Sequence, residues 1–130
     1  LFTMEAPLGQ SAVVDDENVA IAQRIIKFRF FPSSFYPTYV NFLLQTDKFQ
    51  LELQKEGTGS TALGIKASKL HKFRLIKPPI PEQQEIANYI ETESQKIDKA
   101  IGLQQQQIEK LQEYKRVLID SCVTGKVKVC

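Results

Sequence analysis

The sequence predicts an α+β protein: a small mixed α/β body at residues 1–78, followed by one long coiled-coil-forming α-helix within residues 79–130. Short strand-like stretches separated by glycine and proline turns fill the first part of the chain. A proline-rich junction at 77–81 then leads into a stretch with no proline and one internal glycine, Gly102, as far as Val123. Good helix formers dominate that stretch, so we expect one continuous helix.

The body begins with strand-like segments joined by polar turns. Alternation over residues 19–31 predicts the strongest strand, with Lys27 and Arg29 on one face and Phe28 and Phe30 on the other. Pro7 and Gly9 predict a turn over residues 5–10. Further short strands are expected at residues 1–4, 11–14 and 73–76.

A helix is expected from Ser34 or Pro37 to about Glu56. Its aromatic residues occur at helical spacing among aliphatic neighbours, which favours a core position over base stacking. They are Phe35, Tyr36, Tyr39, Phe42 and Phe49. A glycine-rich loop, residues 57–64, follows the helix, and residues 67–70 favour a turn or a short helix.

The positive charge is concentrated in one window of the chain. The 130 residues carry a net charge of +2, yet no acidic residue occurs between Gly57 and Pro81. That window contains Lys66, Lys69, His71, Lys72, Arg74 and Lys77. Such an unbalanced run indicates an anionic partner, most simply nucleic acid, although a solvated surface has the same composition.

Candidate phosphate contacts follow from this charge pattern. We assign the first group to Lys66, Lys69, Lys72 and Arg74, together with the loop hydroxyls of Ser60 and Thr61. A second group is Arg24, Lys27 and Arg29 on the predicted strand. The loop is also compatible with a plain connection, and the strand with the edge of a solvated sheet.

The long helix begins near Pro81, which suits the first helical turn, and Thr124-Gly125 is a plausible stop. It would be roughly 60 Å long. Apolar residues at alternating spacings of three and four predict a coiled-coil seam, interrupted by the polar residues Ser94, Gln104 and Lys115. An ordinary amphipathic helix packed on its own body is the alternative. The predicted helix–helix interface comprises Ile90, Ile97, Ile101, Gln104, Ile108, Leu111 and Leu118.

The sequence contains few groups of residues typical of catalytic or metal sites. One histidine and the two late cysteines, Cys122 and Cys130, do not suffice for a zinc site, a Cys/His pair or a disulfide framework. The glycine-rich loop lacks the Gly-Lys-Ser/Thr ending of a phosphate-binding P-loop. We therefore expect no catalysis, no metal and no cofactor. No apolar run is long enough for a membrane span, and a reducing cytoplasm is the default location.

Several segments together resemble the specificity (S) subunit of type I restriction-modification systems. The junction Pro78-Pro-Ile-Pro81-Glu-Gln83 before a long helix that closes in Val123-Thr-Gly-Lys126 is the most specific of them. The others are Glu5-Ala-Pro-Leu-Gly9, Ile21-Ala-Gln-Arg24, Gly59-Ser-Thr61 with Ile65 and Leu70, Ile86, and Leu111-Gln-Glu-Tyr114-Lys-Arg-Val-Leu-Ile119.

The resemblance implies a target recognition domain that reads one half of a split double-stranded DNA sequence, followed by a helical spacer. In that family the spacers pack antiparallel and dock the methyltransferase (modification) subunits, and the restriction subunits join the complex. The S subunit itself is non-catalytic. The chain would supply the later part of one recognition domain and one spacer, which pairs with a second copy or with the other half of an S subunit. The competing hypothesis is a non-enzymatic coiled-coil scaffold whose globular end binds a protein.

Overall fold

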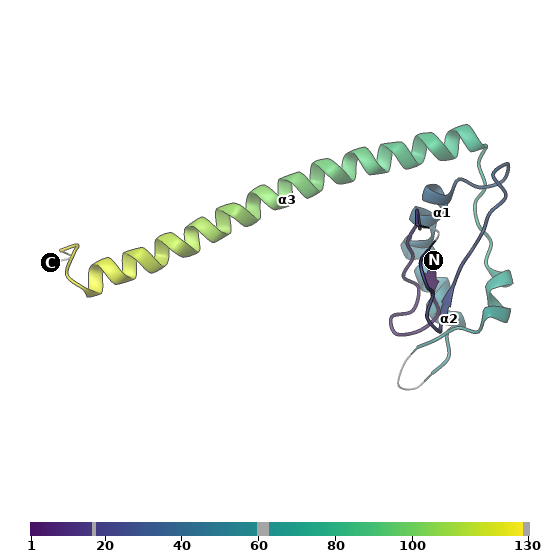
Figure 1. The fold of residues 1–130 in the computed structure, drawn as a ribbon, viewed down its shortest axis with the longest axis horizontal. Helices are drawn as coiled ribbons and strands as arrows, with labels where there is room; N and C mark the ends of the chain where they lie inside the picture. The colour runs from purple at the N-terminus through teal and green to yellow at the C-terminus, as the bar shows by residue number, and fades with distance from the viewer. Residues whose placement is uncertain (17, 60–62, 129–130) are drawn as a thin grey trace. The chain divides into compact units, whose positions relative to one another are not determined.

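The computed structural model describes residues 1–16, 18–59 and 63–128, and it is a mixed structure with much more helix than strand (Figure 1). The chain divides into two compact units, Leu1–Tyr89 and Ile90–Cys130. The elements in chain order are β1 (Phe2–Thr3), β2 (Ile25–Ile26), α1 (Pro37–Leu44), α2 (Asp47–Glu56), the 3₁₀ helix η1 (Ala67–Lys72) and α3 (Ile80–Val123).

The sheet is much shorter than the sequence predicts. β1 and β2 pair antiparallel, with Phe2 opposite Ile26 and Thr3 opposite Ile25. The strand expected over residues 19–31 is reduced to β2, because Arg24 has a φ of 69° just before it and residues 27–31 after it belong to no strand. That left-handed conformation interrupts a strand. Residues 11–14 contribute only an isolated bridge from Ser11 to Phe2, and residues 73–76 are extended without a strand partner.

The helix expected up to Glu56 is two helices rather than one. α1 ends at Leu44 and α2 begins at Asp47, with Thr46 between them in an extended conformation. The Thr46 hydroxyl accepts a hydrogen bond from the Phe49 N–H and donates one to the Leu43 carbonyl. A threonine that bonds to both helix ends explains the break, because its side chain caps the start of α2. Pro37 begins α1, in agreement with the sequence prediction.

The core of the first unit is aromatic, as predicted. Tyr39 and Phe49 are buried, while Phe35, Tyr36 and Phe42 are half-buried and pack against the core. Ring centroids lie 6.2 Å apart for Phe2 and Phe49, and 5.2 Å apart for Phe49 and Phe73. The buried apolar residues are Phe2, Tyr39, Val40, Leu44, Phe49, Leu53, Ile65 and Ala87.

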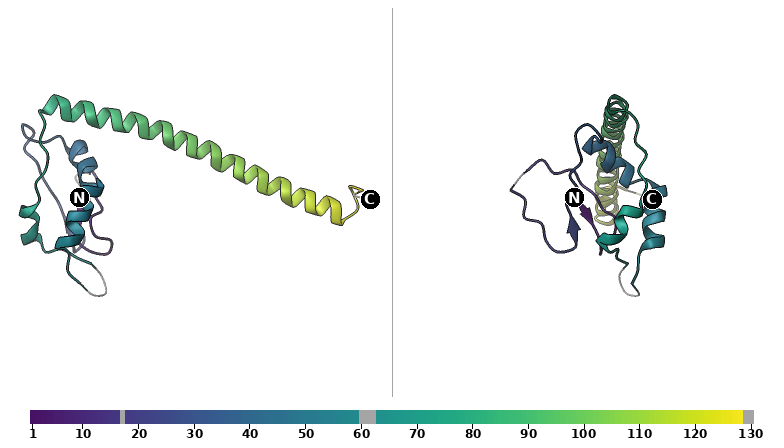
Figure 2. Two further views of the ribbon diagram at one scale, coloured as in Figure 1. Left: turned by 180° about the vertical axis from the view of Figure 1, so that it is seen from behind. Right: turned by 90° about the vertical axis from the view of Figure 1, so that its right-hand side faces the viewer.

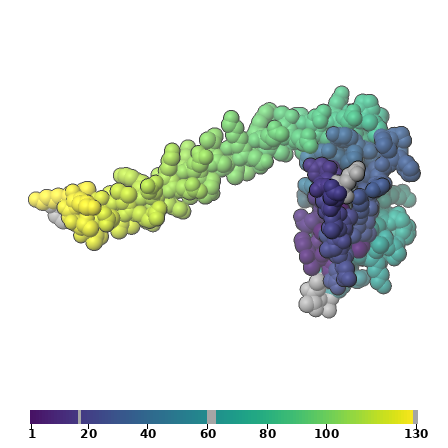
Figure 3. Space-filling view, in the orientation of Figure 1, coloured from purple at the N-terminus to yellow at the C-terminus, as the bar shows by residue number. Residues whose placement is uncertain are grey.

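One turn is fitted closely against α2. Gly9 has a φ of 85°, and a Cβ atom at this position would lie 2.5 Å from the Leu53 side chain. The Gln50 side chain donates hydrogen bonds to the Gly9 and Leu44 carbonyls, at 2.9 and 2.6 Å. Gly9 is therefore required both for its backbone conformation and for the space it leaves. Figure 3 shows the N-terminal segments, in purple and dark blue, on the face of this unit that is turned to the viewer.

The start of α3 is held by a buried glutamine, Gln83, which is completely inaccessible to solvent. Its Oε1 atom accepts a hydrogen bond from the Tyr36 N–H at 2.8 Å. Its Nε2 group donates to the Pro78 carbonyl at 2.7 Å and to the Ser34 carbonyl at 3.2 Å. One side chain thus satisfies backbone groups from the junction and from the segment before α1. The Tyr39 hydroxyl adds a hydrogen bond to the Ile76 carbonyl at 3.2 Å.

Beyond Tyr89 the helix exposes its apolar positions. The predicted seam residues Ile97, Ile101, Ile108, Leu111 and Leu118 are all exposed, and Ile90 is half-exposed. Helix α3 ends at Val123, and Gly125 follows with a φ of 74°, which confirms the predicted stop. Among the described residues, no helix is long and apolar enough to cross a lipid bilayer.

Replacement of Gln83 by alanine should destabilise the first unit by about 3 kcal/mol, because it leaves one buried N–H and two carbonyls without partners. The expected fall in Tm is roughly 15 °C. Thermal unfolding followed by circular dichroism measures it, with Gln84→Ala at the exposed neighbouring position as the matched control. Equal melting temperatures for the two variants would contradict the role assigned to Gln83.

Alkaline pH should weaken the first unit through Tyr39. Burial, and secondarily the nearby Glu82 carboxylate, raise the pKa of Tyr39 above its usual value of 10.0. The neutral hydroxyl is therefore favoured in the folded state, and this contribution to stability is present below pH 10 and lost as the pH rises above it. In Tyr39→Phe, stability should decline less between pH 9 and pH 11 than in the parent chain. Parallel declines in urea denaturation midpoints would rule out this contribution.

Candidate nucleic-acid interface

Helix η1 arranges three of the predicted lysines in a row. Lys66 immediately precedes the helix, and Lys69 and Lys72 lie within it, so consecutive lysines are three residues apart. A 3₁₀ helix has three residues per turn, which places the Lys69 and Lys72 side chains above one another, whereas Lys66 is extended just before the helix. The sequence contained the spacing, but only the 3₁₀ geometry aligns it. Within the first unit, helix η1 lies away from the first turn of α3 (Figure 2).

Glu56, the last residue of α2, lies beside this row. Its carboxylate is 3.6 Å from the Lys69 Nζ atom and 3.7 Å from the Lys72 Nζ atom. Lys69 also donates a hydrogen bond of 2.7 Å to the Glu56 carbonyl. A cation at a helix C-terminus satisfies a free carbonyl and interacts favourably with the helix dipole. Lys69 therefore has a structural role that the sequence did not reveal.

Lys66 and Arg74 are more available to a ligand. Both side chains are exposed, and neither takes part in an ion pair within the described part of the chain. Arg74 lines a small surface hollow together with Lys48 and Glu52 of α2. Lys48 is a further cation on this surface that sequence reasoning missed. No local signal marks it, since it is 26 residues from Arg74 and the fold alone brings them together.

The ends of the glycine-rich loop are anchored close to β1. Thr58 and Gly64 exchange two backbone hydrogen bonds, of 2.8 and 3.1 Å, and the Ile65 N–H donates to the Met4 carbonyl at 2.9 Å. Gly64 also forms a bridge with Glu5. Ser60 and Thr61, the predicted loop contacts, lie outside the described residues. The base of the loop is thus well defined, and it leads directly into the lysine row.

Arg24 is brought to the same region by its ion pair. Its Nη1 atom is 2.8 Å from the Glu5 Oε1 atom, and the Met4 N–H donates to the Arg24 carbonyl at 2.8 Å. Because Glu5 also bridges to Gly64, Arg24 lies next to the base of the loop. A non-glycine residue with positive φ costs about 1 kcal/mol, and such residues are enriched at functional sites.

Lys27 and Arg29 belong to a different part of the surface. They follow β2 and line a groove together with residues of α1 and of the 11–14 segment. Both are exposed, and neither takes part in an ion pair among the described residues. The structure therefore separates the predicted cations into one group around the loop base and η1, and a second group along this groove.

The arrangement around the loop base suits an anionic, extended ligand. Cations outnumber the nearby carboxylates Glu5, Glu52 and Glu56, and most of the cations are exposed. Basic side chains and open backbone next to a loop are the means by which proteins contact phosphates. Within the described ranges, no group of three or more His, Cys, Asp or Glu side chains is placed to hold a metal ion.

Comparison with known proteins gives a consistent result. Residues 1–113 match the family model described as "Type I restriction modification DNA specificity domain". The chain is also 25% identical over 114 residues to the type I restriction enzyme MjaVIII specificity subunit of Methanocaldococcus jannaschii. That alignment covers 88% of this chain and 26% of the relative, so the chain spans about a quarter of the relative's length. No solved structure matches the chain significantly.

Lys69→Ala should lower stability by about 1 kcal/mol, because it removes the hydrogen bond to the last carbonyl of α2 in a partly solvated setting. Lys66→Ala removes the same charge from the same row, and it should change the free energy of unfolding by no more than about 0.5 kcal/mol. Chemical denaturation of both variants measures the difference. Equal stabilities would show that Lys69 does not cap α2.

Proposed function

The chain belongs to the family of type I restriction modification DNA specificity domains, and from that membership we propose that it reads one half of a bipartite double-stranded DNA target. The observation that carries the proposal is the convergence of the lysine row, Arg24 and the anchored base of the glycine-rich loop on one region. These elements come from three distant parts of the chain. Such a surface presents positive charge and also allows the protein backbone to come close to a DNA duplex.

We assign different tasks to different parts of this surface. The exposed cations Lys66, Lys72 and Arg74 contact phosphates and supply sequence-independent affinity that falls with salt. The loop between Thr58 and Gly64, with Ser60 and Thr61, approaches the duplex backbone closely, and side chains that reach base edges supply sequence choice. Arg24 supports the base of the loop and adds a further phosphate contact. Lys69 contributes mainly by fixing η1 to the end of α2.

The exposed seam of α3 is, in our proposal, the spacer of the complex. A long helix with apolar residues at heptad spacing is marginally stable unless a partner covers the seam. We propose that it pairs antiparallel with a second copy or with the other half of an S subunit. The exposure of Ile101 and Leu111 supports this pairing, because no described part of the unit Ile90–Cys130 buries these two side chains. The same spacer would dock the methyltransferase and restriction subunits.

Removing exposed cations should weaken DNA binding and reduce its salt dependence. For Lys66→Ala with Arg74→Ala, the slope of log K against log salt should decrease in magnitude by about 2, since each lost phosphate contact accounts for about 0.9. Fluorescence anisotropy with a mixed-sequence duplex, with the chain assembled with its methyltransferase subunit, measures the slope. The matched control is Lys99→Ala with Lys110→Ala, which removes the same charge from exposed positions outside the seam.

An unchanged slope in the first double variant, or an equal change in both, would argue against the assigned surface. Absence of any salt-dependent binding by the parent assembly would exclude the DNA-reading function and favour the protein-binding scaffold.

A charged residue in the seam should prevent helix pairing. Ile101→Asp removes a large apolar side chain and buries a carboxylate in the paired state, so the association constant should fall by about two orders of magnitude or more. Sedimentation velocity over a concentration series measures association. Lys99→Asp introduces the same residue outside the seam and should leave association nearly unchanged. A parent chain that is monomeric at high concentration, or equal association of both variants, would contradict self-pairing through this seam.

A further inference from the structure

Glu5 contacts two parts of the candidate interface at once. Its Oε1 atom lies 2.8 Å from the Arg24 Nη1 atom, and its backbone forms a bridge with Gly64 at the end of the glycine-rich loop. The stem of its side chain also covers Gly64, because a Cβ atom added there would lie 3.3 Å from the Glu5 Cγ atom. Glu5 therefore joins the Arg24 guanidinium to the base of the loop.

The exposure of the two side chains indicates which of them meets a ligand. The Arg24 side chain is 62% exposed, whereas the Glu5 side chain is 29% exposed. A guanidinium has five N–H donors in a planar fork, and the contact with Glu5 is made through Nη1. Such a fork still presents donors to a second anion, and its geometry suits two oxygens of one phosphate. Arg24 can thus contact Glu5 and a phosphate at the same time.

The backbone that carries the Arg24 side chain is also held in place. Arg24 has a φ of 69°, and its carbonyl accepts a hydrogen bond from the Met4 N–H at 2.8 Å. The Met4 carbonyl in turn accepts one from the Ile65 N–H at 2.9 Å, directly after the loop. Because both backbone and side chain are held before a ligand arrives, a phosphate that binds Arg24 removes less conformational freedom.

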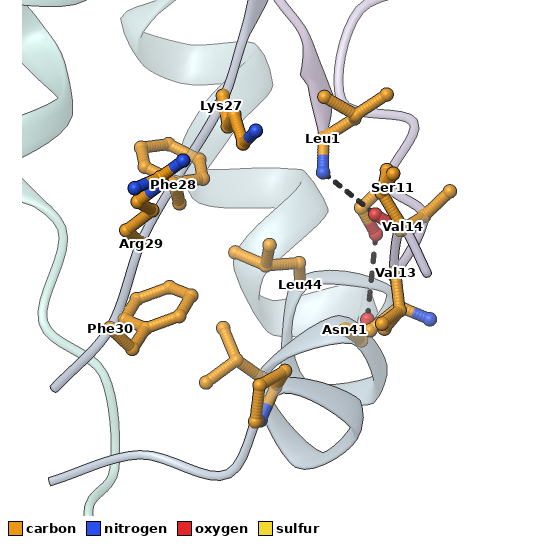
Figure 4. A pocket seen from close by; sticks show the side chains of 13 residues that line it. Leu1, Ser11, Val13, Val14, Lys27, Phe28, Arg29, Phe30, Asn41 and Leu44 are labelled. Carbon is orange, nitrogen blue, oxygen red and sulfur yellow. Dashed lines mark hydrogen bonds between the residues drawn. The ribbon is translucent and has the colours of Figure 1, made fainter. Parts of the chain in front are cut away.

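Arg29 provides the comparison within the same chain. It is an exposed arginine of the second cation group, beside the groove shown in Figure 4, and it makes no ion pair among the described residues. An arginine of this kind must be ordered by its ligand, which lowers its contribution to affinity. The carboxylate beside Arg24 is the feature that distinguishes the two arginines.

We propose that Glu5 is a positioning residue for DNA reading, which orients Arg24 toward a phosphate and ties that contact to the base of the loop. This role rests on the proposed function. Glu5 also repels phosphates, but repulsion between exposed charges in salt changes an affinity by only about twofold or less. Ordering a long side chain in advance changes it by about three- to tenfold. The favourable effect of Glu5 therefore exceeds the unfavourable one.

The test replaces Glu5 by methionine, which keeps an unbranched stem over Gly64 and has no carboxylate. In the chain assembled with its methyltransferase subunit, Glu5→Met should weaken binding of a mixed-sequence duplex by about threefold or more, although it removes a negative charge. Fluorescence anisotropy measures the affinity. The matched control is Glu52→Met, which removes an exposed carboxylate beside Arg74 and should leave binding unchanged or tighten it by about twofold.

A second background separates positioning from a purely structural role. Arg24→Gly removes the guanidinium, and glycine readily adopts the φ of 69° at this position. In that background Glu5→Met should no longer weaken binding and should tighten it by about twofold or less, because only the repulsion is left to remove. A loss caused by poorer folding would instead persist in the absence of Arg24.

NMR of the full chain without DNA checks the orientation directly. The guanidinium protons of Arg24 should exchange with water more slowly than those of Arg29, and Glu5→Met should remove this difference. Equal exchange in the parent chain, unchanged or tighter binding by Glu5→Met, or the same loss with and without Arg24 would overturn the positioning role and leave the proposed function intact. Absence of salt-dependent binding by the parent assembly would overturn both.

Discussion

The side-chain amide of Gln83 joins three parts of the chain that are distant in sequence. It belongs to the first turns of α3, yet it bonds to Ser34 and Tyr36 before α1 and to Pro78 in the junction. Only an amide can meet this demand, since one N–H and two carbonyls need an acceptor and two donors from a single side chain. Because the site is fully buried, an unfilled group there would lower stability substantially. The attachment of the first turns of α3 to the body thus depends on this residue.

The charges of the candidate interface are divided between structure and recognition. Glu56 holds Lys69, and Glu5 holds Arg24, so these two cations also organise the surface on which they lie. Lys66 and Arg74 have no such partners among the described residues and are available to an anionic ligand. In proteins that bind DNA, unpaired cations of this kind supply salt-dependent affinity through contacts with phosphates.

The seam of α3 exposes aliphatic side chains at heptad spacing. A long helix of this kind gains most of its stability from a partner that covers such a seam. The helix pairing proposed above would supply that cover.

The sequence alone determined the features that depend on local chemistry. Helix formers with no proline after Pro81 defined α3, Gly125 defined its end, and Pro37 started α1. The basic window before Pro81 and the family resemblance indicated a nucleic-acid partner. Tertiary structure decided the rest, because those features depend on contacts between distant residues. The length of β2 depends on its partner strand and on the conformation of Arg24, and the break between α1 and α2 depends on hydrogen bonds of Thr46 that compete with helix continuation. Which lysines are neutralised depends on where the end of α2 places Glu56, and the burial of Gln83 depends on the approach of the segment before α1. Residue spacing in the sequence shows the periodicity of a single helix or strand. Ion pairing and burial arise only when several elements come together in space.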